Sequence, residues 1–470
     1  MENKALRKIN HYFKTLSDKE AKRLAEVFQR QVEQLNIRYF NDSGKPRDIQ
    51  LALRPWLIRK EEARFLHRII SCLKASQHKL FSLYLKEKII QEALPLRPKE
   101  KEWFGLINKD KPQKCQTVFG RWDTNLAFNL EHRRKSPEIK FLETNTVAIG
   151  GIHYIPAVSE ALKAVLHKQL QEQIAPYRLD HQPDPRRLLA EEIKRHAGLI
   201  GRGRLNVAFM ENREYAGGTV ELSELTRYFL KLGINAILID PRDLRLKGKE
   251  IFCKDKNIDI IYRDSELQEL VDLEKKGHSM AALKQAFMNN QIISSISGEL
   301  DHKSTFEIFS SPQFCKFFTA QERALFKKYI AWTRVLKERN TTDGRLRKID
   351  LVPYVVKNKA KLIIKPNRAY GGEGVMIGKL AEKVQWNEYV KKAIKRPGDF
   401  VVQALVEIAQ EEFPYFNPQQ KIEFDKFYSV SGIVVTRRSI AVLGRFSKNM
   451  VVNVARKGGI IPTLQLTGKD

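Results

Sequence analysis

Cysteine is scarce in this chain of 470 residues, and its four cysteines are far apart. Cys72, Cys115, Cys253 and Cys315 form no CxxC pair, which argues against a zinc site and is typical of a protein in a reducing compartment. No apolar run approaches the length of a membrane span, and the first residues, MENKALRKINHYF, are too polar for a signal peptide. We therefore expect a cytoplasmic protein without a membrane partner.

The familiar nucleotide-binding motifs are missing as well. The sequence has no GxGxxG dinucleotide motif and no Walker P-loop, which requires GxxxxGK[ST] at the start of a helix. Basic residues, in contrast, are abundant: 84 lysines and arginines against 55 acids give a formal net charge of +29. Such an excess attracts nucleotides, nucleic acid or acidic substrates over a long range, and it does not decide among them.

Hydrophobic residues make up 42% of the chain, enough for a large core in two or three domains. Apolar residues at three- and four-residue spacing predict helices from about Lys4 to Glu92, and Pro95 and Pro98 mark a boundary. Further on, alternating strand and helix patterns between 205 and 262 predict a parallel sheet with crossovers. The glycine-rich connection 217–219 within it is either a ligand site or a turn with a helix N-cap.

The segment Lys361–Gly378, KLIIKPNRAYGGEGVMIG, is the most informative part of the sequence. It predicts an apolar strand that ends near Lys365, a glycine-rich turn, and a second strand. Successive backbone N–H groups in such a turn can bind an anion, and the upstream ammonium can lie beside the same anion. The segment therefore has the parts of a phosphate-binding hairpin. An ordinary glycine-rich hairpin beside a solvated lysine is an equally weighted interpretation.

Polar residues with a spacing of two mark two earlier strands. Arg121 and Asp123 share one face of the first, and Glu143 and Asn145 share one face of the second. If the strands pair, their oxygen atoms gather as ligands for magnesium, with an arginine near a transferring phosphate. For either motif alone, a polar face on a half-exposed hairpin is the better interpretation. The combination with the phosphate-binding hairpin favours the metal site.

Other candidate residues are isolated polar side chains in apolar surroundings. Lys303 lies near the start of a predicted helix, where it is either solvated or a second cation over phosphates. Gln403 lies in the apolar strand FVVQALVEI, which can present backbone groups to a flat heterocycle. Arg445 and Asn453 lie in the strands predicted at 440–447 and 450–455, and face either solvent or a site.

Together these segments resemble the circularly permuted ATP-grasp family, which includes glutathionylspermidine synthetase-like ligases. The matching elements are R-x-D at 121–123, E-x-N at 143–145, IDIIYRD at 258–264, DHKS around Lys303, WTR at 332–334, IKPNRAYGGEGV, RFS and VNVARKGG. They occur in the family's order from about residue 116 to the end, with the metal-ligand strands ahead of the lysine strands. Two features depart from the family: Ala404 stands where many relatives have an acid, and the N-terminal helices have no match.

The resemblance implies a mixed α+β and α/β fold and a role for each matching residue. The implied domains are an N-terminal helical region at 1–95, metal-ligand strands with helices at 96–200, an α/β subdomain at 201–300, and lysine strands with a glycine-rich lid and C-terminal strands at 301–470. The implied ATP-binding residues are Lys303, Lys365, Gly371, Gly372, Gly374, Gln403, Ala404, Val406, Arg445 and Asn453, the implied magnesium ligands are Asp123, Glu143 and Asn145, and Arg121 is the implied catalytic residue.

The implied reaction is an ATP- and Mg²⁺-dependent ligation of a carboxylate to an amine or thiol. ATP converts the acid to an acyl phosphate, ADP and phosphate are released, and the protein contributes positioning and charge neutralisation. Two alternatives remain open at this stage. The first is a catalytically silent nucleotide-binding scaffold, although the presence of Lys365, Asp123, Glu143 and Asn145 argues against a loss of magnesium chemistry. The second is a basic nucleic-acid-binding protein, which would explain the net charge but lacks the expected aromatic and basic interleaving.

Overall fold

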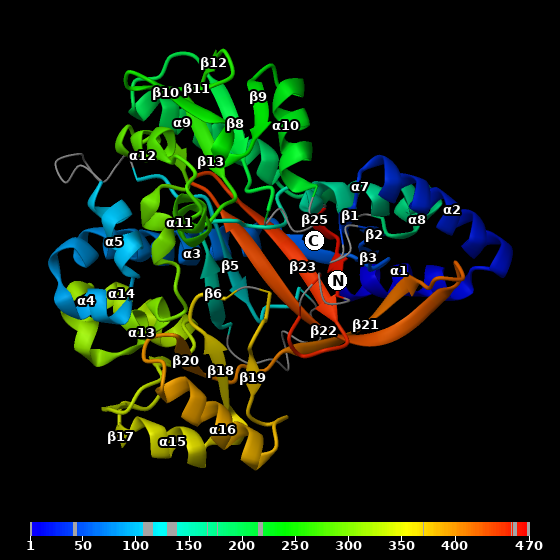
Figure 1. Cartoon of the computed structure of the whole chain (residues 1–470). Helices are drawn as coiled ribbons and strands as arrows, with labels where there is room; N and C mark the ends of the chain where they lie inside the picture. The colour runs from blue at the N-terminus through cyan, green and yellow to red at the C-terminus, as the bar shows by residue number, and fades with distance from the viewer. Residues whose placement is uncertain are drawn as a thin grey trace.

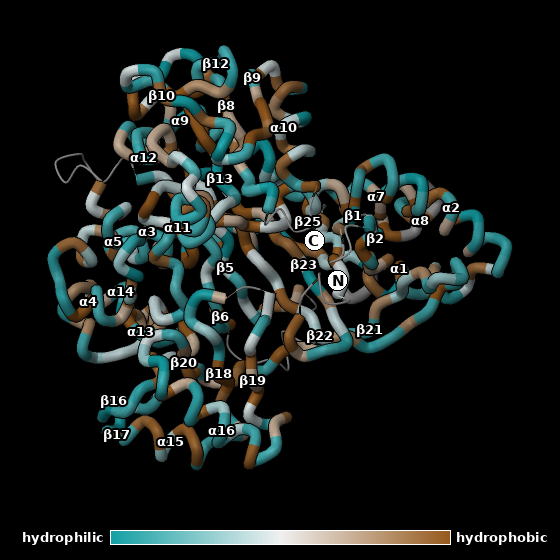
Figure 2. Tube along the Cα trace, viewed as in Figure 1, coloured by the Kyte–Doolittle hydropathy of each residue, from teal (hydrophilic) through white to brown (hydrophobic). Residues whose placement is uncertain are grey.

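The computed structural model describes residues 2–40, 45–106, 116–128, 139–166, 168–175, 177–214, 220–369, 371–452, 454 and 458–467. A central, largely antiparallel sheet runs through the middle of the molecule. A parallel sheet lies at one end of it and a small antiparallel sheet at the other, and helices surround all three (Figure 1). The segments coloured as hydrophobic concentrate in the interior of this arrangement (Figure 2).

The central sheet joins the early and late parts of the chain. Its strand order is β3-β24-β23-β22-β5-β6; the first half of the long strand β22 pairs with β21 and the second half with β5. Helices α3 and α7 pack on it, and the second half of β22 is buried throughout. The strand bounds are Gln50–Leu51 (β3), Gly120–Thr124 (β5), Phe141–Asn145 (β6), Ala409–Phe416 (β21), Ile422–Val435 (β22), Ile440–Ser447 (β23) and Gly459–Ile461 (β24).

The parallel sheet confirms the alternation of strands and helices predicted between residues 205 and 262. Its order is β14-β13-β8-β9, and every pair is parallel. The strands are Asn206–Met210 (β8), Asn235–Ile239 (β9), Ile260–Arg263 (β13) and Ile292–Ile293 (β14), and the neighbouring helices are Pro185–Leu199 (α9), Glu221–Lys231 (α10), Leu267–Lys275 (α11) and Ala281–Met288 (α12).

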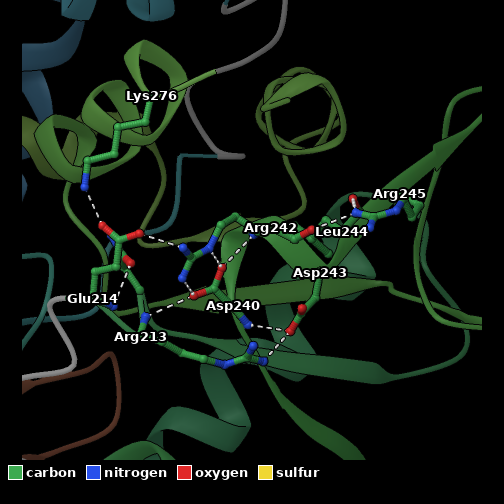
Figure 3. Close-up of polar contacts among 9 residues, drawn as sticks. Arg213, Glu214, Asp240, Arg242, Asp243, Leu244, Arg245 and Lys276 are labelled. Atoms are coloured by element: carbon green, nitrogen blue, oxygen red, sulfur yellow. Dashed lines mark hydrogen bonds and ion pairs between the residues drawn. The ribbon is translucent and has the colours of Figure 1, made fainter. Parts of the chain in front are cut away.

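A network of ion pairs ties the carboxyl ends of β8 and β9 together (Figure 3). Asp240 accepts hydrogen bonds from Arg242 Nε at 2.7 Å and from the Arg213 backbone N–H at 3.0 Å. Glu214 pairs with Arg242 at 2.6 Å and with Lys276 at 2.5 Å. These contacts hold Arg213 and Glu214 beside the end of β9. The candidate connection 217–219 lies outside the described residues.

The small antiparallel sheet has the order β15-β20-β18-β19 and carries the predicted hairpin, since β18 pairs with β19. Leu362, Ile364 and Val402 pack against α15 and α16 in one apolar core. Because side chains alternate along a strand, Lys365 and Gln403 project from the opposite face. The bounds are Thr333–Val335 (β15), Leu362–Pro366 (β18), Met376–Ile377 (β19), Phe400–Ala404 (β20), Leu351–Lys357 (α15) and Lys383–Ile394 (α16).

Two local predictions are wrong. The N-terminal region is not purely helical, because it contains four short strands; β3 pairs with β24, and β4 pairs with β25. The predicted strand 450–455 is not a strand in its described part, 450–452 and 454. In the N-terminal region a partner distant in sequence decides the conformation, and local periodicity does not contain that information.

The remaining elements complete the chain. The helices are Glu2–Thr15 (α1), Asp18–Gln34 (α2), Lys60–Lys86 (α3), Lys88–Ala93 (α4), Pro98–Gly105 (α5), Tyr154–Val165 (α7), Lys168–Gln173 (α8), Thr305–Ser310 (α13) and Ala320–Tyr329 (α14). The strands are Arg38–Phe40 (β1), Pro46–Asp48 (β2), Trp56–Arg59 (β4), Arg178–His181 (β7), Leu244–Lys247 (β10), Glu250–Cys253 (β11), Lys256–Asn257 (β12), Asn340–Thr342 (β16), Lys348–Asp350 (β17) and Thr463–Thr467 (β25). Within the described ranges, none of the helices has the length and apolarity that a membrane span needs.

Trp122 on β5 joins the central sheet to the helices beside it. Its side chain is 1% exposed, meets Phe141 edge-on at a centroid distance of 5.5 Å, and stacks on Phe306 of α13 at 6.2 Å. We expect Trp122→Ala to lower the free energy of unfolding by about 3–5 kcal/mol, because it leaves a large cavity. Urea titration measures the change. The control Leu380→Ala, at a residue that is 66% exposed, should stay within about 0.5 kcal/mol, and equal losses would contradict this packing.

Candidate active site

A pocket lies between the central sheet and the small antiparallel sheet. Its walls come from β5 and β6, from the segment before α13, from the hairpin β18–β19, from the end of β20 and from the C-terminal strands. The lining residues are Asp123, Leu142, Glu143, Lys303, Ile363, Lys365, Pro366, Ala369, Gly371, Gly372, Glu373, Val375, Ile377, Gln403, Ala404, Leu405, Val406, Ile408, Val430, Arg445, Met450, Val451 and Val452.

The two strands with polar residues at a spacing of two do pair. In the antiparallel register of β5 and β6, Asp123 lies opposite Glu143 and Arg121 lies opposite Asn145. All four side chains therefore belong to one face of the sheet, as the spacing predicts. Asp123 and Glu143 reach the pocket wall, whereas Arg121 and Asn145 do not line it and contact Asp123 instead.

Asp123 is held by two arginines from different strands. Arg121 donates from Nε to Oδ1 at 2.7 Å and from Nη2 to Oδ2 at 3.1 Å, and Arg445 Nη2 lies 2.8 Å from Oδ2. Burial raises the pKa of Asp123, but the two guanidinium groups outweigh it and lower the pKa to about 2. The carboxylate is therefore ionised at neutral pH, and in this arrangement it orients two cations. Asn145 Nδ2 donates to the same carboxylate at 3.4 Å.

Lys303 connects the central sheet to the glycine-rich hairpin. Its Nζ lies 3.4 Å from Glu143 Oε2 and donates to the Ala369 carbonyl at 2.7 Å. Burial raises the pKa of Glu143, while Lys303 and Lys365 lower it, and the net effect is a lowered pKa. Glu143 is therefore a carboxylate beside two lysines, which is a suitable position for a metal ligand next to bound phosphate.

Lys365 lies near the end of β18 and is 8% exposed. Its Nζ donates to Gln403 Oε1 at 2.9 Å. Burial lowers the pKa of Lys365 to about 8, although the nearby Glu143 raises it. The ammonium is therefore largely charged at neutral pH and loses its proton in mildly alkaline solution. With Arg121, Arg445 and Lys303, it gives the site more cations than carboxylates, which favours an anionic ligand.

The glycine-rich turn has the conformation that its glycines allow. Gly371, Gly372 and Gly374 have φ values of 62°, 72° and 61°, in the left-handed region that other residues rarely adopt. A Cβ on Gly372 would lie 2.4 Å from Val451 Cγ1, so this glycine also permits close packing against the C-terminal segment. Gly371 and Gly372 line the pocket, while Gly374 lines the neighbouring groove beside Arg368.

The sequence prediction missed the apolar part of the pocket. Ile363 precedes Lys365 by two residues on β18, lies opposite Gln403 in the register, and belongs to the pocket wall. Ile377 and Val430 provide further apolar surface. Such a wall suits the flat face of a heterocycle. Strand alternation identifies Ile363, since it shares a face with Lys365, but no local pattern identifies Val430.

Ten of the predicted site residues lie together in the pocket, although they come from distant parts of the chain. They are Asp123, Glu143, Lys303, Lys365, Gly371, Gly372, Gln403, Ala404, Val406 and Arg445. Arg121 and Asn145 lie directly behind them and Gly374 lies beside them, while Asn453 is outside the described residues. The roles of these residues in binding or catalysis stay predictions.

The charged side chains of the pocket, most of them cations, fit the phosphates of ATP more directly than they fit a metal ion alone. Among the described residues, no group of three histidine, cysteine or acidic side chains is arranged to hold an ion. Magnesium, however, is usually bound by one or two carboxylates together with phosphate oxygens and water. Glu143, with Asn145 and Asp123 beside it, meets that smaller requirement when a nucleotide supplies the other oxygens.

Removing the charge of Asp123 tests the arrangement of the arginines. We expect Asp123→Asn to lower the free energy of unfolding by about 3–5 kcal/mol at pH 7, because the buried Arg121 and the partly buried Arg445 would lose their counter-charge. Denaturant titration measures the loss. Glu102, in an exposed pair with Lys99, supplies the control Glu102→Gln, which should leave the unfolding curve unchanged. A similar absence of change in Asp123→Asn would contradict the charge network.

Comparison with solved structures shows the fold. No protein-family model and no curated protein matches the chain. Among solved structures, the chain is similar to a glutathione synthetase-like effector from Globodera pallida, in apo form, with a TM-score of 0.62 and 11% identity over 96% of this chain and 98% of that chain.

Two further similarities are weaker. A protein from Methylobacillus flagellatus, described as a candidate gamma-glutamylcysteine synthetase, gives a TM-score of 0.38 at 9% identity over 84% of this chain and 88% of that one. The ATP-grasp ligase PsnB gives a TM-score of 0.25 at 10% identity over 53% of this chain and 90% of that one. These two scores are too low to support an argument. The first similarity shows the fold alone: the chain has the fold of that glutathione synthetase-like effector.

Proposed function

We propose that this protein is an ATP- and Mg²⁺-dependent ligase that joins a carboxylate to an amine or a thiol and releases ADP and phosphate. The observation that carries the proposal is the pocket itself. Glu143, Lys303 and Lys365 come from segments up to about two hundred residues apart and converge beside one glycine-rich turn. We further propose that the order of the acid strands before the lysine strands reflects a circularly permuted ATP-grasp chain.

Each residue has a defined part in this reaction. Lys365 and Lys303 bind the phosphates, and the apolar wall with the backbone from Ala404 to Val406 accommodates the adenine. The acid attacks the terminal phosphorus, the bond to the ADP oxygen breaks, and the amine then displaces phosphate from the acyl phosphate. Arg121 and Arg445 neutralise the charge on the transferring group, and the glycine-rich turn excludes water from the acyl phosphate.

Glu143 and Asn145, with Asp123 behind them, are the side chains that would hold magnesium. The ion, when bound, neutralises phosphate charge and aligns the phosphates for displacement. The arginines that hold Asp123 must move toward phosphate before its oxygens can bind an ion. Such an exchange of partners is consistent with a site that is completed only by the nucleotide.

A catalytically silent nucleotide-binding protein is the second candidate. It is favoured by the occupied oxygens of Asp123 and by the similarity to a protein described as an effector. Retention of Lys365, Lys303 and Glu143 in one pocket favours the ligase. Nucleic-acid binding remains the alternative that the net charge of +29 suggests. Salt-dependent binding of nucleic acid without ATP turnover would support it.

The reaction class is tested by a screen of carboxylates and amines with ATP and magnesium. We expect release of ADP that depends on the acid, and a product whose mass equals acid plus amine minus water. Lys365→Met should abolish turnover, while Lys383→Met, at an exposed position at the start of α16, should not affect it. Release of AMP would refute the proposed bond cleavage, and tight ATP binding without any turnover would favour the silent protein.

The pKa of Lys365 predicts how nucleotide affinity depends on pH. The ammonium is protonated below about pH 8 and neutral above it, so its attraction for phosphate is lost as the pH rises. We expect the dissociation constant for ATP to rise about tenfold between pH 7 and pH 9. Lys365→Arg, which stays charged, should remove most of this dependence. Calorimetric titration at each pH measures the affinity, and a flat profile in the wild type would contradict the assignment.

A further inference from the structure

Gln403 is buried in the pocket wall, and both the oxygen and the nitrogen of its carboxamide are hydrogen-bonded. The side chain is 1% exposed and lies on β20 opposite Ile363 of β18 and Thr333 of β15. Its Oε1 accepts a hydrogen bond from Lys365 Nζ at 2.9 Å. Its Nε2 donates to the Leu142 carbonyl at 3.1 Å and to Thr333 Oγ1 at 2.9 Å.

These partners determine the orientation of the amide. An ammonium only donates and a carbonyl only accepts, so the amide oxygen must face Lys365 and the amide nitrogen must face Leu142. Thr333 uses its own hydroxyl hydrogen toward the Ala331 carbonyl at 2.9 Å, and its oxygen is therefore the acceptor for Gln403. Both N–H groups of the amide are thus used inside the protein. The side chain therefore has no N–H left for an adenine ring, and the predicted contact of this strand with a heterocycle rests on its backbone groups.

The amide also connects two sheets. Lys365 belongs to the small antiparallel sheet, whereas Leu142 immediately precedes Glu143 on β6 of the central sheet. A single side chain therefore ties the ammonium of Lys365 to the strand that carries Glu143. The other charged groups that act on Lys365 are Glu143, Lys303 and Asp123. Gln403 is a neutral partner in hydrogen-bonding contact with the ammonium.

We propose that Gln403 is a positioning residue that fixes the Lys365 ammonium relative to Glu143, so that the lysine and the carboxylate meet one triphosphate from opposite sides. This inference rests on the proposed function of the pocket as a nucleotide site. Glutamine meets the requirement because glutamate would place a carboxylate oxygen against the Leu142 carbonyl, and methionine would leave both the carbonyl and the ammonium unpaired.

A double-mutant cycle on nucleotide affinity tests the proposal. ATP binding is measured by calorimetry with magnesium for the wild type, Gln403→Met, Lys365→Met and the double variant. We expect Gln403→Met to weaken binding about tenfold in the wild type and less than about twofold when Lys365 is already methionine. Equal losses in both backgrounds would overturn the proposal. If the wild type fails to bind ATP, the proposed function fails, and the role of Gln403 in nucleotide binding fails with it.

A second measurement uses the ligand-free protein and separates positioning from loss of structure. An amine-selective reagent is applied at pH 8, and mass spectrometry compares labelling of Lys365 with labelling of the exposed Lys361. We expect Gln403→Met to speed the labelling of Lys365 and Gln403→Glu to slow it, because the first change removes an acceptor and the second adds a negative charge. Labelling that changes in the same direction in both variants would indicate local unfolding and would overturn the proposal.

Discussion

The antiparallel pairing of β5 with β22 is the interaction on which the candidate site depends. It brings Asp123 beside Gly432, more than three hundred residues later, and places the acid strands at the edge of a sheet built mainly from the C-terminal part of the chain. Gly432 has no side chain, and a Cβ there would lie 2.6 Å from Arg121 Cδ and 2.8 Å from Asp123 Oδ1. The arginine and the aspartate therefore pack across the glycine, in space that the neighbouring strand leaves open.

The charges of the site are buried or partly buried, and they are stable because each lies beside a partner. Isolated charges would be expensive in this environment, but Asp123 lies between two guanidinium groups and Glu143 lies beside Lys303. The partners leave an excess of positive charge that an anionic ligand can compensate. Burial is the largest influence on the pKa of Lys365 and lowers it. The neutral side chain that accepts a hydrogen bond from its ammonium is that of Gln403.

The hairpin β18–β19 and the two acid strands illustrate why so much of the site is predictable from sequence. Strand alternation puts Arg121 and Asp123 on one face of β5 and Glu143 and Asn145 on one face of β6, and glycine is the residue type that tolerates the positive φ of the turn at Gly371. These are local consequences of backbone geometry. Asn453, the remaining predicted ATP-binding residue, lies outside the described residues.

The sequence by itself determined the residue types, their spacing along each strand and the alternation that led to the parallel sheet. It did not determine which distant strands pair, because the free energy of pairing comes from contacts across the fold. For the same reason the strands β3 and β4 were predicted as helix. Only the tertiary structure decided that Asp123 binds Arg445 and that Gln403 holds Lys365, since hydrogen bonds between separate strands depend on how the two sheets face each other.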